Sequence, residues 1–282
     1  MAVSYQELKS ERQWRSSTGL KESQFKILVG HFAEAYEQIF GESLPERKSN
    51  SSQESVFKTY EELLFFVLFS LKSGLTYDVL GFVFGLDGSN AQRNQKSALP
   101  VLRLALSRAG VMPARGFSSV KDFEAWFSAD NAVQKESYSG KKKSHTVKAL
   151  VISNPQKLIR YISRSYFGRA HDFGILKTEF PPQKTWFQRF KIRLDLGFLG
   201  FEDLYPCEQF YLPNKKPKKQ ELSEEQKAEN KAQASERVAA EHSIAGLKRY
   251  RFLSHRLHAH DPKLYDLVLG VCAGLWNFSL LN

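Results

Sequence analysis

The segment Lys191-Ile-Arg-Leu-Asp-Leu-Gly-Phe198 holds a short apolar strand that ends at Asp195 and enters a glycine turn. A second carboxylate, Glu241, lies within a long basic helix that covers residues 235–251. If the fold brought these two acids together, they would attract a divalent cation, because such ions prefer clustered oxygen ligands. Each acid also has an ordinary explanation. Asp195 is equally typical of a turn, and Glu241 could pair with Arg237 four residues earlier in the helix.

The sequence around these two acids predicts a mixed α/β region. Apolar runs in residues 146–153 and 158–166, joined by a turn at Asn154-Pro155, indicate a β-hairpin. A short helix is expected from His171-Asp172 onward, and a third strand over residues 192–194. Ser223-Glu-Glu-Gln226 is a capping box that opens a helix running to about Leu253.

The N-terminal half is predicted to be helical. Three helices are expected, over residues 60–73, over residues 77–84, and from Ser89 past Pro100 toward Leu106. Two helices joined by a short glycine turn are typical of a helix-turn-helix motif. In that motif the last helix would present its polar side chains to a DNA groove, and these are Asn90, Gln92, Arg93, Asn94, Gln95 and Lys96. A small helical bundle with a solvated polar face explains the pattern equally well, and only the net charge favours DNA.

Composition favours a folded protein with a polyanionic partner. The 282 residues are 42% hydrophobic, and 41 basic residues against 30 acidic ones give a net charge of +11. Clustered Lys and Arg are typical of proteins that neutralise phosphates, although an ordinary basic enzyme has the same balance. Cys207 and Cys272 show neither zinc-finger nor disulfide-scaffold spacing. No signal peptide is evident, and the apolar stretch 267–281 is shorter than a bilayer span. A cytoplasmic protein without a membrane partner is therefore expected.

Five ordered blocks in the second half resemble a known family. They are Tyr138-Ser-Gly-Lys-Lys-Lys-Ser-His-Thr-Val-Lys148, Gly168-Arg-Ala-His-Asp172, Asp195-Leu-Gly-Phe198, Asn214-Lys-Lys-Pro217, and Glu236-Arg-Val-Ala-Ala-Glu241-His242 with Leu247-Lys248. Their order and spacing are similar to those of the DDE transposases, close to the branch shared by bacterial insertion sequences and PIF/Harbinger elements. The resemblance covers roughly residues 134–278, and the preceding helices resemble the DNA-binding part of the same family.

The resemblance implies both a fold and a chemistry. It implies an RNase H-like core over residues 116–282 after a helical DNA-binding region over residues 1–115. The implied chemistry is metal-dependent cleavage at transposon ends, followed by transfer of the freed 3′ hydroxyl to target DNA. Three carboxylates would hold the divalent cations, Mg²⁺ or Mn²⁺. The implied partners are double-stranded DNA, as transposon ends and target, and a second copy of the chain. The implied location is the nucleoid.

The resemblance assigns roles to individual acids. Asp195 matches the second catalytic aspartate of the family, and Glu241 matches its catalytic glutamate. Asp172 matches a recurrent acid that would lie near the metal, and it is also well suited to a helix start. These three residues form the predicted metal site.

The resemblance also assigns residues to the DNA path. The residues that would line that path are Lys141, Lys142, Lys143, His145 and Lys148. Two further residues fall near the helical face of Glu241 and could contact phosphate, namely Arg237 and Lys248. Taken alone, the lysine run is more typical of a solvated turn.

The first catalytic aspartate of the family has no counterpart. It would lie on an apolar strand upstream of Tyr138, but residues 127–137 contain neither an apolar run nor an Asp-Thr-Glu motif. Asp122 falls on an expected amphipathic helix over residues 119–127, and Asp130 falls in a polar loop. We therefore infer an internal deletion near residues 127–130 that removed the first strand with its aspartate. Loss of that strand would expose a sheet edge, and loss of the carboxylate would impair catalysis.

Three functions remain consistent with the sequence. The leading one is a DDE transposase by descent, impaired by the deletion. The second is a DNA-binding protein without catalysis, either a remnant or a recruited module. The third is a structure-selective nuclease that does not transpose DNA.

Overall fold

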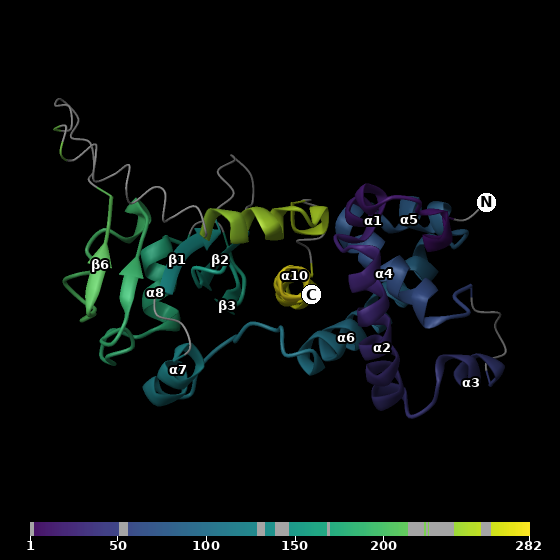
Figure 1. Cartoon of the computed structure of the whole chain (residues 1–282), viewed down its shortest axis with the longest axis horizontal. Helices are drawn as coiled ribbons and strands as arrows, with labels where there is room; N and C mark the ends of the chain where they lie inside the picture. Colours follow the sequence, from purple (N-terminus) through teal and green to yellow (C-terminus); the bar gives the residue numbers. More distant parts are fainter. Residues whose placement is uncertain are drawn as a thin grey trace. The chain divides into compact units, whose positions relative to one another are not determined.

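The structure is a computed structural model of the chain (Figure 1). It describes residues 3–50, 56–128, 133–138, 147–167, 170–213, 223, 225, 240–254 and 261–282, with backbone alone for 133–138. The chain divides into two compact units, which are described separately. The first contains residues 1–112 and 246–282, and the second contains residues 113–245.

The first unit is helical, as the sequence predicts. Its elements are η1 (Tyr5–Glu7), α1 (Glu11–Thr18), α2 (Glu22–Phe40), α3 (Leu44–Ser49), α4 (Tyr60–Ser73), α5 (Tyr77–Phe84), α6 (Gly88–Arg108), η3 (Arg251–Ser254) and α10 (Pro262–Leu281).

The ends of α4 and α6 follow from local chemistry. The Thr59 hydroxyl accepts a hydrogen bond from the backbone N–H of Glu62 at 3.2 Å and starts α4. Asp87 starts α6 by accepting from the N–H of Asn90 at 2.7 Å. Pro100 lies inside α6 on its exposed side. The helix continues through it to Arg108, as expected.

The C-terminal helix α10 packs within the first unit, which differs from the predicted division at residue 115. The Asn277 side-chain amide donates to the carbonyl of Val111 at 2.9 Å, and the Gln24 amide donates to the carbonyl of Ser279 at 3.0 Å. An all-round apolar helix buries itself against other apolar helices wherever its residues lie in sequence. The apolar stretch expected over residues 267–281 is shorter than α10, which begins at Pro262. α10 is long and apolar enough to cross a membrane, but most of it is buried as in a core helix.

The second unit is a mixed α/β unit built on one sheet, as predicted. Its elements are α7 (Val120–Phe127), β1 (Val133–Tyr138), β2 (Val147–Ser153), β3 (Ile159–Ile162), β4 (Tyr166–Phe167), α8 (Asp172–Glu179), β5 (Lys191–Arg193), η2 (Leu196–Phe198) and β6 (Gln209–Tyr211). The strand order is β3-β2-β1-β5-β6, and β4 pairs separately with β2. The hairpin of β2 and β3 is antiparallel, whereas β1, β5 and β6 are parallel to one another.

The predicted loss of the first strand is wrong. β1 lies between β2 and β5, antiparallel to the first and parallel to the second, so neither neighbour is left with an open edge on that side. The expectation failed because it required an apolar run. Backbone hydrogen bonds between strands do not require an apolar run. The edges of β2 and β5 would otherwise be unpaired, so even a polar segment is favoured as a strand between them. The aspartate expected on that strand is nevertheless absent, since β1 reads Val-Gln-Lys-Glu-Ser-Tyr.

One aromatic-rich core fills one face of this sheet. The sheet contributes Leu150, Ile152, Ile192 and Leu194 to it. The helices contribute Phe123, Phe127, Ile175 and Leu176, and the connecting segments contribute Phe180, Phe187 and Phe198. The core therefore fixes α7, α8 and the turn after β5 against the same face.

Candidate active site

Asp195 lies at the end of β5, as the sequence predicts. The chain stays extended at this residue, and the Leu194 N–H still donates to the carbonyl of Tyr211 in β6 at 3.0 Å. The Asp195 Oδ1 atom then accepts a hydrogen bond from the N–H of Gly197 at 2.7 Å. This bond starts η2, so Asp195 serves as a turn residue while its carboxylate stays at the end of the sheet.

Asp172 is the first residue of α8, and it forms an ion pair. Its Oδ1 atom lies 3.1 Å from the Lys148 ammonium, which also donates to the carbonyl of Ala170 at 2.9 Å. The side chains of Lys148 and Asp172 are only 15% and 18% exposed. The family resemblance implies that Lys148 lines the DNA path, whereas the structure places its ammonium against a candidate metal ligand.

Asp172 and Asp195 meet at Gly197. A Cβ atom on Gly197 would lie 2.9 Å from Oδ1 of Asp195 and 3.1 Å from Oδ2 of Asp172. Both distances are tighter than a side chain normally tolerates, so a glycine is needed where the two carboxylates approach each other. Two of the three predicted acids are thus brought together by α8 and the turn after β5.

Glu241 lies on a separate helical segment, residues 240–248, and is exposed. The segment is tied to the β2–β3 hairpin because the Ser243 hydroxyl donates to the carbonyl of Lys157 at 2.8 Å. Within the part of the chain that the structure describes, no three His, Cys, Asp or Glu side chains form a metal-binding group. Glu241 therefore does not form such a group with Asp172 and Asp195.

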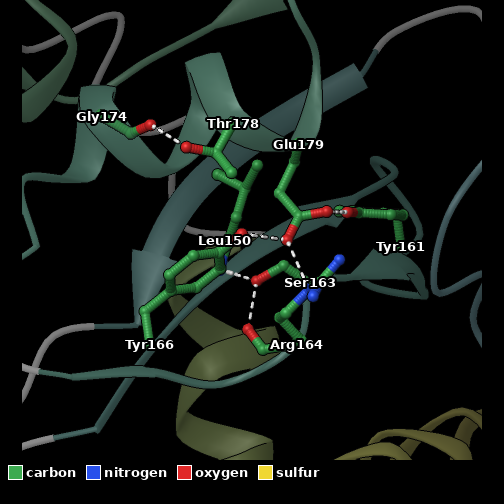
Figure 2. Close-up of polar contacts among 8 residues, drawn as sticks. All are labelled: Leu150, Tyr161, Ser163, Arg164, Tyr166, Gly174, Thr178 and Glu179. Carbon is green, nitrogen blue, oxygen red and sulfur yellow. Dashed lines mark hydrogen bonds and ion pairs between the residues drawn. The ribbon is translucent and has the colours of Figure 1, made fainter.

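The far end of α8 is held by a buried carboxylate, which Figure 2 shows. Glu179 accepts hydrogen bonds from the hydroxyls of Tyr161 at 2.8 Å and Tyr166 at 2.5 Å. Arg164 lies 3.8 Å away, and the Glu179 side chain is 9% exposed. Burial, and after it the Glu179 carboxylate, raise the pKa of both phenols. Both tyrosines therefore stay protonated donors that fix the helix on which Asp172 lies.

The polar residues of α6 divide into three groups. Arg93 and Lys96 are exposed, and Lys96 lies 3.9 Å from the Asp261 carboxylate in a solvent-accessible pair. Asn90 donates its amide to Asp87 at 2.5 Å, and Gln92 is half-buried. Gln95 is 1% exposed. Its amide N–H donates to the Ser70 hydroxyl at 2.7 Å, and its amide oxygen accepts from the Tyr77 hydroxyl at 2.8 Å. The expectation that Gln95 faces a groove is wrong, since these two bonds hold it between helices.

Several predicted residues are not part of this geometry. The described residues do not include Lys141, Lys142, Lys143, His145, Arg237 and Asp130. Most of the helix expected from Ser223 also lies outside them. Lys248 is exposed and belongs to the first unit. Asp122 lies in the first turn of α7, where its N–H donates to the Ser119 hydroxyl at 3.1 Å.

The donor atoms of the aspartate pair suit a divalent cation. Two partly buried carboxylates converge where no side chain intervenes, and carboxylate oxygens are the ligands that Mg²⁺ and Mn²⁺ prefer. The ammonium of Lys148 balances the charge of Asp172, so a cation that bound Asp172 would have to displace or share that contact. Sequence reasoning missed the Lys148 pair and the Glu179 cluster because neither leaves a local pattern.

Comparison with known proteins identifies the class. A family profile described as "DDE superfamily endonuclease" matches residues 127–277, more than half of the chain, and the chain belongs to that family. It is 30% identical over 148 residues to the probable transposase for insertion sequence element IS702 of Microchaete diplosiphon. That region is 52% of this chain and 51% of the relative, so the chain matches about half of the relative's length. No solved structure matches this chain. The resemblance to DDE transposases is confirmed, and the PIF/Harbinger branch stays a prediction.

Proposed function

We propose that this protein acts on double-stranded DNA in transposition. The first unit binds DNA through the α5–α6 helix-turn-helix, and the second is an RNase H-like core that cleaves phosphodiester bonds at transposon ends. Asp172 and Asp195 would hold a divalent cation, Mg²⁺ or Mn²⁺, and Glu241 would have to approach them to join the site. The observation that carries the proposal is the meeting of Asp172 and Asp195 at Gly197 in a chain of the DDE endonuclease family.

The bound cation and the residues around it would have separate roles in the reaction. A bound divalent cation would supply Lewis-acid activation of the attacking oxygen and charge stabilisation on the leaving oxygen. Asp195 and Asp172 present their carboxylates from the end of a strand and the start of a helix, both fixed by the core. Lys148 holds the Asp172 carboxylate in place through their ion pair. The strand order and directions of the sheet support the RNase H-like assignment.

The net charge of +11 supports the DNA partner. Exposed Arg93 and Lys96 on α6 would contact phosphates or base edges. Because transposition joins two ends, a second copy of the chain is also proposed on DNA, in the cytoplasm at the nucleoid.

The test uses the purified full chain and a plasmid that carries its gene with the natural flanking DNA. Binding is followed by gel shift at rising salt, and cleavage by gel after addition of Mg²⁺ or Mn²⁺. We expect salt-sensitive binding, and cuts in the DNA that flanks the gene, which Asp195→Asn abolishes. Absence of binding at low salt, or cutting that survives Asp195→Asn, would overturn the proposal.

A DNA-binding protein without cleavage is the second candidate. It is favoured by the absence of a three-acid group among the described residues and of the expected aspartate in β1. The same assay separates the two functions, since this candidate predicts binding with no cut in either metal.

A further inference from the structure

A basic segment packs against the C-terminal end of α4 in the first unit. Gly74 ends α4 in a left-handed conformation, and a Cβ atom there would lie 2.7 Å from the carbonyl carbon of Arg251. The backbone at Arg251 therefore touches the end of α4 at a position that only a glycine permits. Lys72, in the last turn of α4, donates from its ammonium to the carbonyl of Arg249 at 2.9 Å. These contacts place Lys72 beside the segment that carries both arginines.

Aromatic rings lie under two of these three cations. The Arg249 guanidinium lies 6.0 Å from the centre of the Trp276 ring, and the Lys72 ammonium lies 5.8 Å from the centre of the Tyr250 ring. Both rings are buried, and the face of an aromatic ring attracts a cation. Arg249 and Arg251 are nevertheless exposed, and Lys72 is half-buried. A ligand in solvent can therefore reach the two guanidiniums.

The three cations carry like charges that no described carboxylate neutralises. Within the part of the chain that the structure describes, none of them forms an ion pair. Burial lowers the pKa of Lys72, and the charges of Arg249 and Arg251 lower it further. The sequence around the arginines is also free of acids, since residues 242–260 contain no Asp or Glu. Gathering like charges costs free energy, which a bound anion would offset.

The phosphate backbone of DNA is the anion that fits this arrangement. A guanidinium presents five N–H donors in a planar fork that matches the oxygens of a phosphate. A polymer of phosphates engages several cations at once and releases its own counterions. The α6 face is less uniformly basic, because Lys96 lies 3.9 Å from the Asp261 carboxylate and Asp87 starts the helix. The cluster at the end of α4 is therefore the stronger candidate for a backbone contact.

We propose that Lys72, Arg249 and Arg251 form a second DNA-binding surface of the first unit, made of residues outside the helix-turn-helix. The inference rests on the proposed function, since it adds a contact to the same duplex DNA. Contacts to phosphate carry no sequence information. This surface would therefore hold the duplex in position, while α6 would contact its bases.

The experiment measures binding of the full chain to DNA by fluorescence anisotropy at several salt concentrations. One labelled duplex comes from the natural DNA that flanks the gene, and a second has the same composition in shuffled order. Wild type is compared with Arg249→Gln, Arg251→Gln and Arg15→Gln. The control, Arg15→Gln, removes the same charge from an arginine of α1 that already pairs with Glu11 at 2.7 Å. Circular dichroism confirms that each variant is folded.

We expect Arg249→Gln and Arg251→Gln each to reduce the slope of log affinity against log salt by about 1 on both duplexes. Arg15→Gln should leave the slope unchanged. If the wild type binds neither duplex, the proposed function fails together with this inference. If the wild type binds and both variants keep its slope, only this surface is excluded. A loss confined to the natural duplex would also overturn the inference, because phosphate contacts act on any sequence.

A lysine variant separates the charge of Arg251 from its packing. Arg251→Lys keeps the charge and should restore the wild-type slope. Arg251→Gln should melt at or above the wild-type temperature, because it removes one of three like charges. A lower melting temperature, with a slope that Arg251→Lys does not restore, would mean that the side chain acts through packing and would overturn the assignment. Lys72→Met removes a charge while keeping an apolar side chain, and it serves if a glutamine variant does not fold.

Discussion

At the scale of single residues, the pair of Lys148 and Asp172 is a largely buried ion pair. Both side chains are mostly buried, and the ammonium also donates to a carbonyl. Asp172→Asn removes the negative partner and leaves a partly buried cation with a weaker acceptor. We expect a loss of about 1.5–3 kcal/mol in the free energy of unfolding, measured by urea denaturation.

An exposed ion pair provides the control for this prediction. Lys191 and Glu208 lie 3.7 Å apart with side chains that are 45% and 58% exposed. Glu208→Gln should cost less than about 1 kcal/mol, because solvent screens exposed charges. Equal costs for the two substitutions would show that the Asp172 contact contributes no more than a surface pair.

Gly197 is the residue that permits the two carboxylates to approach each other. Gly197→Ala would place a methyl group within 3.1 Å of both acids, so at least one must move. We expect Mn²⁺ binding to weaken by about tenfold or more, with a modest loss of stability. Titration of Mn²⁺ measures the affinity and urea denaturation measures the stability.

Gly174→Ala in α8 is the matched substitution. Its Cβ atom would meet only His171, at 3.8 Å, which is ordinary contact. Alanine is favoured over glycine within a helix by about 0.5–1 kcal/mol, so this variant should be slightly more stable and keep its Mn²⁺ affinity. A loss of affinity as large as that of Gly197→Ala would contradict the role given to Gly197.

At the scale of elements, α8 is held at one end by Glu179 and carries Asp172 at the other. Glu179→Ala would leave the buried phenol of Tyr161 and the partly buried phenol of Tyr166 without their acceptor. We expect a cost of about 2–4 kcal/mol in the free energy of unfolding. Glu124→Ala, which removes a pair with the 78% exposed side chain of Arg189, should cost less than about 1 kcal/mol. Similar costs would mean that the cluster does not hold α8.

The same cluster predicts a pH dependence. Burial and Glu179 raise the pKa of Tyr161 and Tyr166 in the folded state, whereas an unfolded tyrosine ionises near pH 10. A raised folded pKa contributes stability that is present below pH about 10 and lost as the pH rises further. Tyr161→Phe should therefore reduce the fall in unfolding free energy between pH about 9 and 11. An identical fall would contradict the argument.

The elements could be predicted where local chemistry determines them. α4 and α5 match their expected bounds because Gly74 and Gly85 end them in left-handed conformations. The β2–β3 hairpin was predicted from its apolar pattern. β1 was missed because its polar residues carry no apolar pattern, and only the edges of β2 and β5 specify a strand there. Long-range pairing of this kind leaves no local signal.

The site shows the same division between local and long-range determinants. Asp195 and the helix start at Asp172 could be predicted because each lies at the end of an element with a recognisable turn or helix signal. The meeting of the two acids at Gly197 and the Lys148 contact depend on how distant segments pack. Neither could be derived from sequence spacing.

At the scale of the whole molecule, the net charge of +11 predicts binding to DNA that depends on salt. Arg93→Ala and Lys96→Ala should each reduce the slope of log affinity against log salt by about 1, if each residue contacts one phosphate. Lys26→Ala is the control, since that exposed lysine of α2 already pairs with Glu22 at 2.6 Å. Gel shifts at several salt concentrations measure the slope. Equal slopes in all three variants would mean that DNA does not contact Arg93 and Lys96.

The proposed metal site of Asp172 and Asp195 is tested by calorimetric titration of Mn²⁺ into wild type, Asp195→Asn and Asp172→Asn, each confirmed as folded by circular dichroism. Each substitution should weaken Mn²⁺ binding by about tenfold or more. Wild-type affinity in either folded variant would contradict it.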